Sequence, residues 1–368
     1  MSASLYSFQK ARRKLIALRS DGLMKAIGFT HPLPGSHPDS LQDFECSKPE
    51  AEERDLLVRV HAISVNPVDT KIRRSQASDS QEGFPRVLGW DVAGVVESVG
   101  PVVSLFQFGD EVYYSGSLIR PGANSEYHLV DERLVAKKPT TVSMAQAAAL
   151  PLTAITAYEA LFDRMGISRD GEVDGRSILI IGGAGGVGSL AIQLAKVAKL
   201  HVIATASRPE SQAWCRKMGA DAVIDHTHSI PDQLQHIQRP MVDYIFNTSS
   251  TDQHWQAMCE AIKPHGRICG IVDTVKSVDL NALKRKSATF AWEFMFSRSM
   301  YQTEDMVQQH ELLTHVARWV DAQMIQSTLT ETLSPINAEN LRAAHATIEA
   351  GHMIGKLVLT GWSEEPSS

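Results

Sequence analysis

The chain has 368 residues, more than one hydrophobic core usually supports, so we expect two domains. Hydrophobic residues make up 43% and charged residues 21%, values typical of soluble globular proteins, which argues against extensive disorder. The net charge of -6 results from 36 Lys+Arg and 42 Asp+Glu, and it gives no electrostatic reason to bind nucleic acid or an anionic membrane. A small molecule is the expected partner.

The cysteines and the apolar runs favour a cytoplasmic protein. The four cysteines are far apart and form no CxxC pair, so neither a disulfide framework nor a structural zinc site is expected: Cys46, Cys215, Cys259 and Cys269. No apolar run approaches the roughly 18 residues that a membrane-spanning helix needs. We therefore expect a protein of a reducing compartment, with no membrane as partner.

Residues 1–23 differ from the rest of the chain. They contain five basic residues and no acidic residue before Asp21, but they lack the continuous apolar core of a secretory signal. We interpret them as a poorly ordered N-terminal extension or the result of an early start codon, and an organelle address remains the alternative. The first strand is expected to begin at Met24.

Residues 24–152 show short strand-like runs separated by Pro, Gly and Asp, which predicts a compact β-rich domain. These runs are Leu56–Val60, Val92–Val96 and Glu111–Tyr114. From about residue 145 the pattern changes, and an amphipathic helix is expected from Thr156 to Arg164.

Residues 153–296 then alternate between strands and helices, which is typical of βαβ units on a parallel sheet. The expected strands are Ser177–Ile181, His201–Ala206, Ala222–Ile224, Val242–Phe246 and Arg267–Ile271, and the expected helices are Val187–Lys199, Ser211–Met218 and one around Trp255–Ile262. Residues 297–368 resume a mixed pattern, with helices near Gln309–Ala322 and Ala338–Ala350 and a strand at Lys356–Leu359 that is expected to fold back on the first domain. The predicted fold class is α/β.

A glycine turn links the first of these strands to the helix that follows it. Its pattern is GxGxxG, with the fixed glycines at Gly183, Gly185 and Gly188 and with Gly186 and Val187 between them. Glycine permits a tight turn, a close approach of the backbone to a pyrophosphate and close packing of helix on strand. Because strand, turn and helix occur in the required order, we predict a dinucleotide site rather than a flexible loop.

The end of the second strand indicates which dinucleotide binds. NAD enzymes carry an acidic residue roughly 20 residues past the turn to hold the ribose 2'-hydroxyl. Here Ser207 and Arg208 occupy that place, and both can bind a 2'-phosphate. We therefore predict NADPH as cofactor, with a solvated loop arginine as the alternative.

These residues occur together with further motifs that resemble the zinc-independent quinone oxidoreductases of the medium-chain dehydrogenase/reductase superfamily. The motifs are Asn66–Thr70, Gly89–Val96, Gly109–Val112, Ala148–Tyr158 and the glycine turn. The resemblance spans Met24 to the C-terminus. It implies a GroES-like catalytic domain at residues 24–152, completed by residues 297–368, around a Rossmann NADP-binding domain at residues 153–296. It also implies a homodimer or homotetramer.

The same motifs predict that no metal binds. Zinc-dependent relatives use a cysteine and the histidine of a Gly-His-Glu triplet, whereas this chain has Ser64-Val65-Asn66 and Gly89-Trp90-Asp91 at those places. Without a Lewis acid, a conjugated acceptor such as a quinone or an enone is favoured over a simple ketone or alcohol. An alcohol dehydrogenase or aldehyde reductase, and a non-catalytic NADPH-binding protein, remain the alternatives.

The resemblance assigns candidate roles to single residues. Asn66 matches an active-site asparagine whose amide could donate to the substrate oxygen, or it is only the turn residue before Pro67. Lys71 replaces an aromatic residue and could stabilise an enolate or quinol anion, or it is a solvated surface lysine. Trp90 and Phe294 are candidates for an apolar substrate pocket, with core packing as the alternative.

Further cofactor contacts are expected around the sheet. Thr156, placed at the start of the domain-crossing helix, resembles a threonine that contacts the nicotinamide ribose or carboxamide, and helix capping is its alternative role. The other expected contacts lie after successive strands or near the C-terminus: His226, Asn247, Gly270, Ile271 and Lys356.

Overall fold

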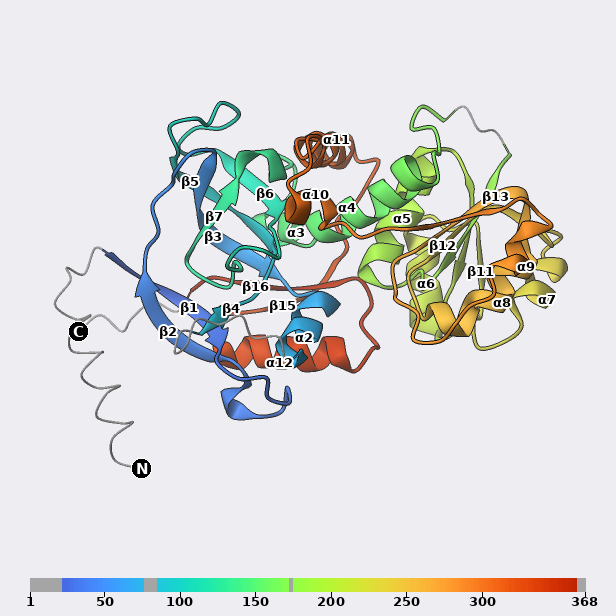
Figure 1. The fold of residues 1–368 in the computed structure, drawn as a ribbon, viewed down its shortest axis with the longest axis horizontal. Coiled ribbons are helices and arrows are strands. Elements are labelled where there is room, and N and C mark those ends of the chain that lie inside the picture. The colour runs from blue at the N-terminus through green and yellow to red at the C-terminus, as the bar shows by residue number, and fades with distance from the viewer. Residues whose placement is uncertain (1–21, 76–84, 172–174, 363–368) are drawn as a thin grey trace.

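The computed structural model describes residues 22–75, 85–171 and 175–362 of the chain. Two lobes are visible in Figure 1, and helix α4 runs from one to the other. The first contains both ends of the described chain, and the second contains the middle of the sequence. The expected extension at residues 1–21 lies outside the described residues.

The first lobe is built on a seven-stranded sheet in the order β15-β16-β3-β5-β6-β8, with β7 paired to β3. Its strands are β3 (Asp55–Ser64), β5 (Asp91–Val99), β6 (Glu111–Ser115), β7 (Tyr127–Asp131), β8 (Val135–Lys137), β15 (Leu329–Leu333) and β16 (Lys356–Thr360). A smaller sheet, in the order β2-β1-β4, consists of β1 (Leu23–Phe29), β2 (Gln42–Ser47) and β4 (Arg86–Val87). Because β16 pairs antiparallel with β3, the C-terminal end of the chain belongs to the same sheet as its N-terminal part.

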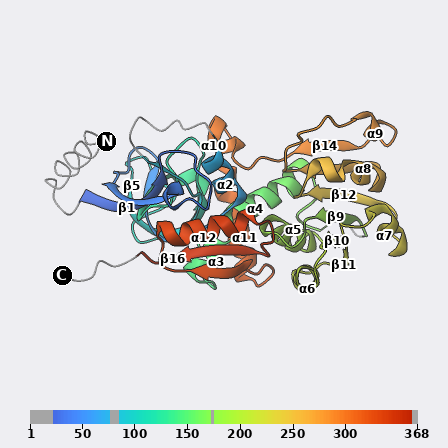
Figure 2. The same cartoon turned by 90° about the horizontal axis from the view of Figure 1, so that it is seen from below.

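Short helices surround this sheet, and α2 (Pro67–Arg74) packs on α12 (Ala338–Glu349) (Figure 2). Arg73 of α2 is completely buried; its Nε donates to Nδ1 of His345, and its guanidinium pairs with Glu349. Arg73 is therefore a structural link between the two helices. The remaining helical segments of this lobe are η2 (Pro38–Ser40), η3 (Glu132–Leu134), α3 (Met144–Ala148), α10 (Ser297–Tyr301) and α11 (Gln308–Asp321).

The second lobe is a six-stranded parallel sheet in the order β11-β10-β9-β12-β13-β14. Its strands are β9 (Ser177–Ile181), β10 (His201–Thr205), β11 (Ala222–Ile224), β12 (Val242–Asn247), β13 (Ile262–Gly270) and β14 (Thr289–Trp292). Its helices are α5 (Gly186–Val197), α6 (Pro209–Lys217), α7 (Ile230–His236), α8 (Thr251–Ala261) and α9 (Asn281–Lys284). The strand order reverses between β9 and β12, and ligands of such sheets bind at this point, beyond the carboxyl ends of the strands. The predicted α/β class is confirmed.

The connection between the lobes differs from the expected amphipathic helix starting at Thr156. Helix α4 already begins at Pro151 and ends at Tyr158, and a π-helical segment, η4, continues it over Glu159–Arg164. All eight residues of α4 are buried because the helix lies between the two lobes. A helix buried on every side has no polar face, so its sequence shows no amphipathic periodicity.

No helix in the described ranges is long and apolar enough to cross a membrane.

Two glycines of the turn should respond differently to replacement by alanine. A Cβ on Gly188 would lie 2.2 Å from the carbonyl oxygen of Gly182, whereas the atom nearest to a Cβ on Gly185 is 3.8 Å away. We expect Gly188→Ala to lower the free energy of unfolding by about 2 kcal/mol or more, because the added methyl group would prevent α5 from packing closely on the end of β9. Gly185→Ala should cost about 1 kcal/mol or less, mainly from its place at the helix N-cap. Urea unfolding followed by circular dichroism measures both, and equal losses would contradict the close-packing argument.

Candidate active site

The glycine turn is held firmly between β9 and β10. The backbone N–H groups of Gly182 and Gly183 donate to the hydroxyl and carbonyl oxygens of Thr205, at 3.0 and 3.1 Å. Helix α5 starts directly after Gly185, so the first N–H groups of α5 have no acceptor within the helix. Free N–H groups at a helix N-terminus favour an anion. This turn fits the diphosphate of a dinucleotide.

Gly186, which the GxGxxG pattern leaves variable, is close to a residue from the far end of the chain. A Cβ at this position would lie 2.8 Å from Cδ of Lys356 and 3.1 Å from Cγ2 of Thr153. The neighbouring Gly355 donates its N–H to the carbonyl oxygen of Ala184 at 2.9 Å. The start of β16 is therefore packed directly against the glycine turn.

The ammonium group of Lys356 enters a buried polar cluster, which we define as Asn66, Asp69, Asp91 and Lys356. Its Nζ donates to the carbonyl oxygen of Val65 at 2.8 Å, to Oδ1 of Asn66, and to Oδ2 of Asp91 at 3.3 Å. Asp91 also accepts from the Nδ2 of Asn66 at 2.8 Å and from the backbone N–H of Leu152 at 2.7 Å. The cluster joins α2 and the residues that link it to β3 with β5, β16 and the start of α4.

Burial governs the protonation of this cluster. It raises the pKa of the Asp91 carboxyl and lowers the pKa of the Lys356 ammonium, while the attraction between the two groups opposes both shifts. Burial also raises the pKa of the Asp69 carboxyl to about 7, against the hydrogen bond that this carboxylate accepts from the backbone N–H of Asn66. Asp69 Oδ1 is buried with no hydrogen-bond partner among the described residues. Asp69 is thus the member of the cluster that can change its charge near neutral pH.

Asn66 is oriented differently from the predicted substrate donor. Its Nδ2 donates to Asp91 Oδ2 and, at 3.3 Å, to the carbonyl oxygen of Ser64, so both amide hydrogens are used inside the protein. Asn66 is also the N-cap residue of α2, which agrees in part with the alternative that it is a turn residue before Pro67. The amide oxygen of Asn66 accepts from Lys356, so both ends of this amide are engaged within the protein.

Lys71 lies apart from the polar cluster. It occupies the exposed side of α2, and its ammonium has no hydrogen-bond or ion-pair partner among the residues that the structure describes. A role at the substrate stays a prediction for this residue.

Thr156 is not at the start of α4 as expected, but at its sixth position. Its Oγ1 donates to the carbonyl oxygen of Leu152 at 2.8 Å, one turn back in the helix, so it does not cap the helix either. The same helix carries Thr153, which faces Gly186. A contact of Thr156 with the cofactor stays a prediction, and Thr153, which the sequence alone did not single out, lies against the glycine turn.

Ser207 and Arg208 follow β10 at the start of α6. The Nη2 of Arg208 donates to the carbonyl oxygen of His352 at 2.8 Å, and its Nη1 lies 3.3 Å from a carboxylate oxygen of Glu210. The side chain of Arg208 is 41% exposed, so both contacts are open to exchange with a ligand. Glu210 was not singled out from the sequence, and its charge acts directly on Arg208.

The cofactor-contact candidates at the carboxyl ends of the later strands mainly make contacts within the protein. Asn247 is completely buried, and its Nδ2 donates to Oγ1 of Thr251 at 3.0 Å, which orders the start of α8. Ile271 donates its N–H to the carbonyl oxygen of Asn247 at 3.2 Å. Gly270 faces the aromatic rings that follow it on β14, where a Cβ would lie 3.2 Å from Phe290. His226 is half-buried, with its ring centroid 6.2 Å from that of His254.

Trp90 and Phe294 both contact Phe296 but differ in their exposure. Trp90 is only 1% exposed; its Nε1 donates to the carbonyl oxygen of Ser117 at 3.1 Å, and its ring meets Phe296 edge-on. Phe294 packs on the same Phe296 but is 49% exposed. Trp90 is thus a core residue, which agrees with the core-packing alternative, and substrate contact stays a prediction for both residues.

Comparison with known proteins agrees with this geometry. The family described as "Alcohol dehydrogenase GroES-like domain" matches residues 52–140, and the family described as "Zinc-binding dehydrogenase" matches residues 186–310. A zinc-type alcohol dehydrogenase-like protein of Staphylococcus aureus is 48% identical over 337 residues, which are 91% of this chain and 99% of that protein. The chain belongs to the medium-chain dehydrogenase/reductase superfamily. It is an oxidoreductase of this superfamily, and the predicted resemblance is confirmed.

Other proteins that are similar to this chain have different names. A solved structure from Rhizobium etli CFN 42, named a candidate zinc-dependent alcohol dehydrogenase, is 48% identical, has a TM-score of 0.88 and covers 93% of this chain and 99% of that chain. The chloroplastic quinone-oxidoreductase homolog of Spinacia oleracea is 29% identical and covers 92% of this chain and 98% of that protein. A 2-methylene-furan-3-one reductase of Solanum lycopersicum is 42% identical over 197 residues, 50% of this chain and 49% of that protein.

The donor atoms of this medium-chain dehydrogenase/reductase do not fit a catalytic zinc ion. Such a site needs three protein ligands from Cys, His and carboxylates. At the places where zinc-dependent relatives carry ligands, the Oγ of Ser64 donates to the carbonyl oxygen of Leu357, Trp90 is in the core, and Asp91 is bonded to an ammonium. Within the described ranges no group of three His, Cys, Asp or Glu side chains could hold a metal ion.

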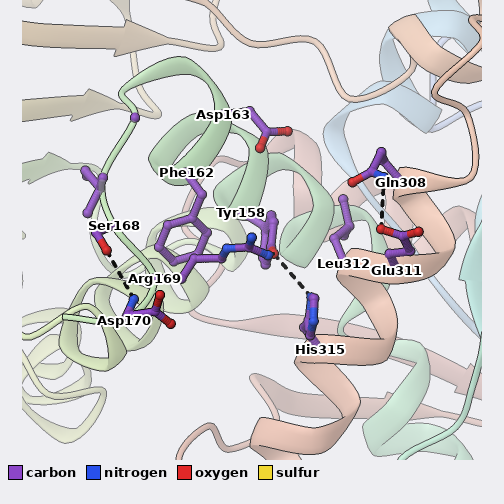
Figure 3. Close-up of a pocket in the computed structure, with 12 residues that line it drawn as sticks. Tyr158, Phe162, Asp163, Ser168, Arg169, Asp170, Gln308, Glu311, Leu312 and His315 are labelled. Atoms are coloured by element: carbon purple, nitrogen blue, oxygen red, sulfur yellow. Dashed lines mark hydrogen bonds between the residues drawn. The ribbon is translucent and has the colours of Figure 1, made fainter. Parts of the chain in front are cut away.

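A cavity of about 430 Å³ lies at a different place in this protein. It is formed by η4, the loop after η4 and α11, and Figure 3 shows Tyr158, Arg169 and His315 on its inner side. The Nη1 of Arg169 donates to the hydroxyl of Tyr158 at 2.6 Å. None of the predicted cofactor or substrate residues lines this cavity, so it is separate from the candidate active site.

The protonation of Asp69 should make stability depend on pH. Because the carboxyl has a pKa of about 7 in the folded protein and about 3.9 in an unfolded chain, the folded state binds its proton more tightly. The contribution of Asp69 to the free energy of unfolding therefore falls as pH rises from about 4 to about 7. An Asp69→Asn variant lacks this titration, and wild type should lose up to about 4 kcal/mol relative to it across that window. Urea titrations of both proteins at a series of pH values test this, and parallel pH profiles would contradict it.

Proposed function

We propose that this protein is an NADPH-dependent reductase that transfers hydride to an enone or a quinone without a metal ion. The observation that carries the proposal is the filled polar cluster at the glycine turn. Lys356, Asn66 and Asp91 satisfy one another, and the only cation that these groups hold is the lysine ammonium. The site therefore offers a fixed charge network rather than an open Lewis-acid position.

The choice of cofactor rests on the end of β10. Arg208 is partly exposed there, and its two present partners are a backbone carbonyl and a surface carboxylate, which a 2'-phosphate can replace. Ser207 supplies a hydroxyl next to it. NADPH bound on the glycine turn would supply the hydride, while the residues of the chain bind and orient it.

The choice of acceptor rests on charge. Reduction of a simple ketone places a negative charge on a single oxygen, which usually needs a metal or a strong proton donor. Both amide hydrogens of Asn66 are already engaged, so Asn66 offers no such donor. Enones and quinones spread the charge by conjugation and need only modest stabilisation, for which the exposed Lys71 is a candidate. The names of the spinach and tomato relatives support this acceptor class.

The assembly and location of the protein follow from the same features. Strand β14 forms an edge of the parallel sheet with no further strand beside it in the described part of the chain, and Trp292 on this edge is 47% exposed. We infer that copies of the chain associate there into a homodimer or homotetramer. The four unpaired cysteines fit a reducing compartment, for which we propose the cytoplasm.

A spectrophotometric assay tests the reaction. Wild-type protein dialysed against a chelator should oxidise NADPH with 2-cyclohexenone or 1,4-benzoquinone and show no detectable rate with cyclohexanone, because the saturated ketone lacks conjugation. Turnover of simple alcohols together with one equivalent of bound zinc would contradict the proposal. NADPH binding without turnover of any acceptor would instead indicate a binding protein.

Cofactor selectivity provides a second test, with opposite changes at neighbouring residues. Arg208→Ala should weaken NADPH binding roughly 10- to 100-fold, about 1.5–3 kcal/mol, and leave NADH binding unchanged. Glu210→Gln removes the carboxylate that competes for Arg208, so it should strengthen NADPH binding about twofold to fivefold. Fluorescence titrations with both cofactors measure these effects, and an equal loss for NADPH and NADH in Arg208→Ala would contradict the assignment.

A further inference from the structure

Lys356 connects the turn that would hold the cofactor with the polar groups of the other lobe. Its stem lies against Gly186, at the first position of α5, and its backbone N–H donates to the carbonyl oxygen of Thr328 at 2.8 Å. Its ammonium lies among Val65, Asn66 and Asp91. The methylene groups of Lys356 thus contact the glycine turn, and its ammonium contacts the residues at the end of β3 and at the start of β5.

The ammonium has no capacity left for a substrate. A lysine has three N–H donors, and here three oxygen atoms accept them. Lys356 is also only 4% exposed. It therefore cannot serve as proton donor or anion ligand without giving up one of these bonds, which indicates that it acts through its partners.

The main partner on which it acts is Asn66. Lys356 holds the amide oxygen and Asp91 holds the amide nitrogen, so the two opposite charges fix one of the two possible amide orientations. Asp91 in turn accepts from Leu152, directly at the start of α4. A continuous chain of contacts therefore links Gly186 to Asn66, Asp91 and α4.

We propose that Lys356 is a positioning residue that couples occupation of the glycine turn to the orientation of Asn66 and Asp91. This inference rests on the proposed function, since it takes the turn to be the seat of a nicotinamide dinucleotide. It explains why Gly186, which the phosphate-binding pattern leaves variable, is a glycine. Any larger side chain would push the lysine stem out of its path.

The first experiment removes the charge and keeps the stem. Lys356→Met should weaken NADPH binding roughly tenfold and lower kcat for 2-cyclohexenone roughly tenfold, with the KM for the acceptor little changed. The Asp91→Asn/Lys356→Met double variant removes both buried charges and retains the volume, so it provides a folded sample if the single variant does not fold. The double variant should also show the lower kcat, because neither end of the Asn66 amide is then held by a charge.

A matched control separates positioning from general stability. Lys138 is another buried lysine of the first lobe; its Nζ donates to the carbonyl oxygens of Pro139 and Val142 and pairs with Glu111, away from the glycine turn. Lys138→Met should lower the thermal midpoint but leave kcat and NADPH affinity of the folded protein within twofold of wild type.

A double-mutant cycle tests the contact itself. Gly186→Ala should weaken NADPH binding, because its methyl group would lie 2.8 Å from the lysine stem, and Lys356→Ala should make this substitution less harmful than it is in wild type. If folded Lys356→Met and the double variant keep wild-type kcat and NADPH affinity, or if the cycle is additive, the inference is wrong while the proposed function stands. A wild-type protein that fails to bind NADPH would contradict both.

Discussion

A buried ammonium group is stable only where oxygen atoms replace the water that would otherwise surround it. In this protein the ammonium of Lys356 finds these oxygen atoms on residues 65, 66 and 91, while the backbone beside it pairs with residues 184 and 328. Segments from across the chain must therefore be in place before this one charge is satisfied. Removing one member of a buried pair typically costs about 3–5 kcal/mol, so the arrangement of both lobes depends strongly on this cluster.

The same constraint shapes the candidate site. The lysine stem leaves no room for a side chain at Gly186. The buried charges also fix the amide of Asn66 and hold Asp91 in the protein interior. In a zinc site, the side chain at position 91 would face the metal ion. In this protein, Asp91 instead accepts a hydrogen bond from the ammonium of Lys356. The proposed transfer of hydride to a conjugated acceptor fits such a site, because that acceptor carries its developing charge without a metal ion.

The parts of the fold that the sequence predicted are those that depend on neighbouring residues. Strand β9, the glycine turn and helix α5 form a local unit, and β9 is recognisable as an uninterrupted apolar run because both faces of a parallel sheet are covered. The acidic residue missing after β10 is equally local, so Arg208 could be singled out. The fold class and the superfamily followed from several such motifs together.

The site itself was less predictable because its contacts are distant in sequence. Lys356 and Asn66 are 290 positions apart, and nothing near either residue reveals that they bond. Asp69 was read as part of a motif, whereas its unusual protonation arises from burial. The side-chain hydrogen bonds of Trp90 and Thr156 to the carbonyl oxygens of Ser117 and Leu152 are not evident from the sequence, and the roles predicted for both residues stay predictions.

Isotope transfer directly tests whether this protein moves hydride to a conjugated acceptor without a metal ion. Chelator-treated protein is incubated with 2-cyclohexenone and NADPH deuterated at the transferable C4 position, and the product is analysed by mass spectrometry. We expect a saturated ketone that carries one deuterium at the β-carbon, formed at the same rate before and after chelation. An activity that disappears with the chelator and returns with zinc, or a product in which the carbonyl carbon carries the deuterium, would contradict it.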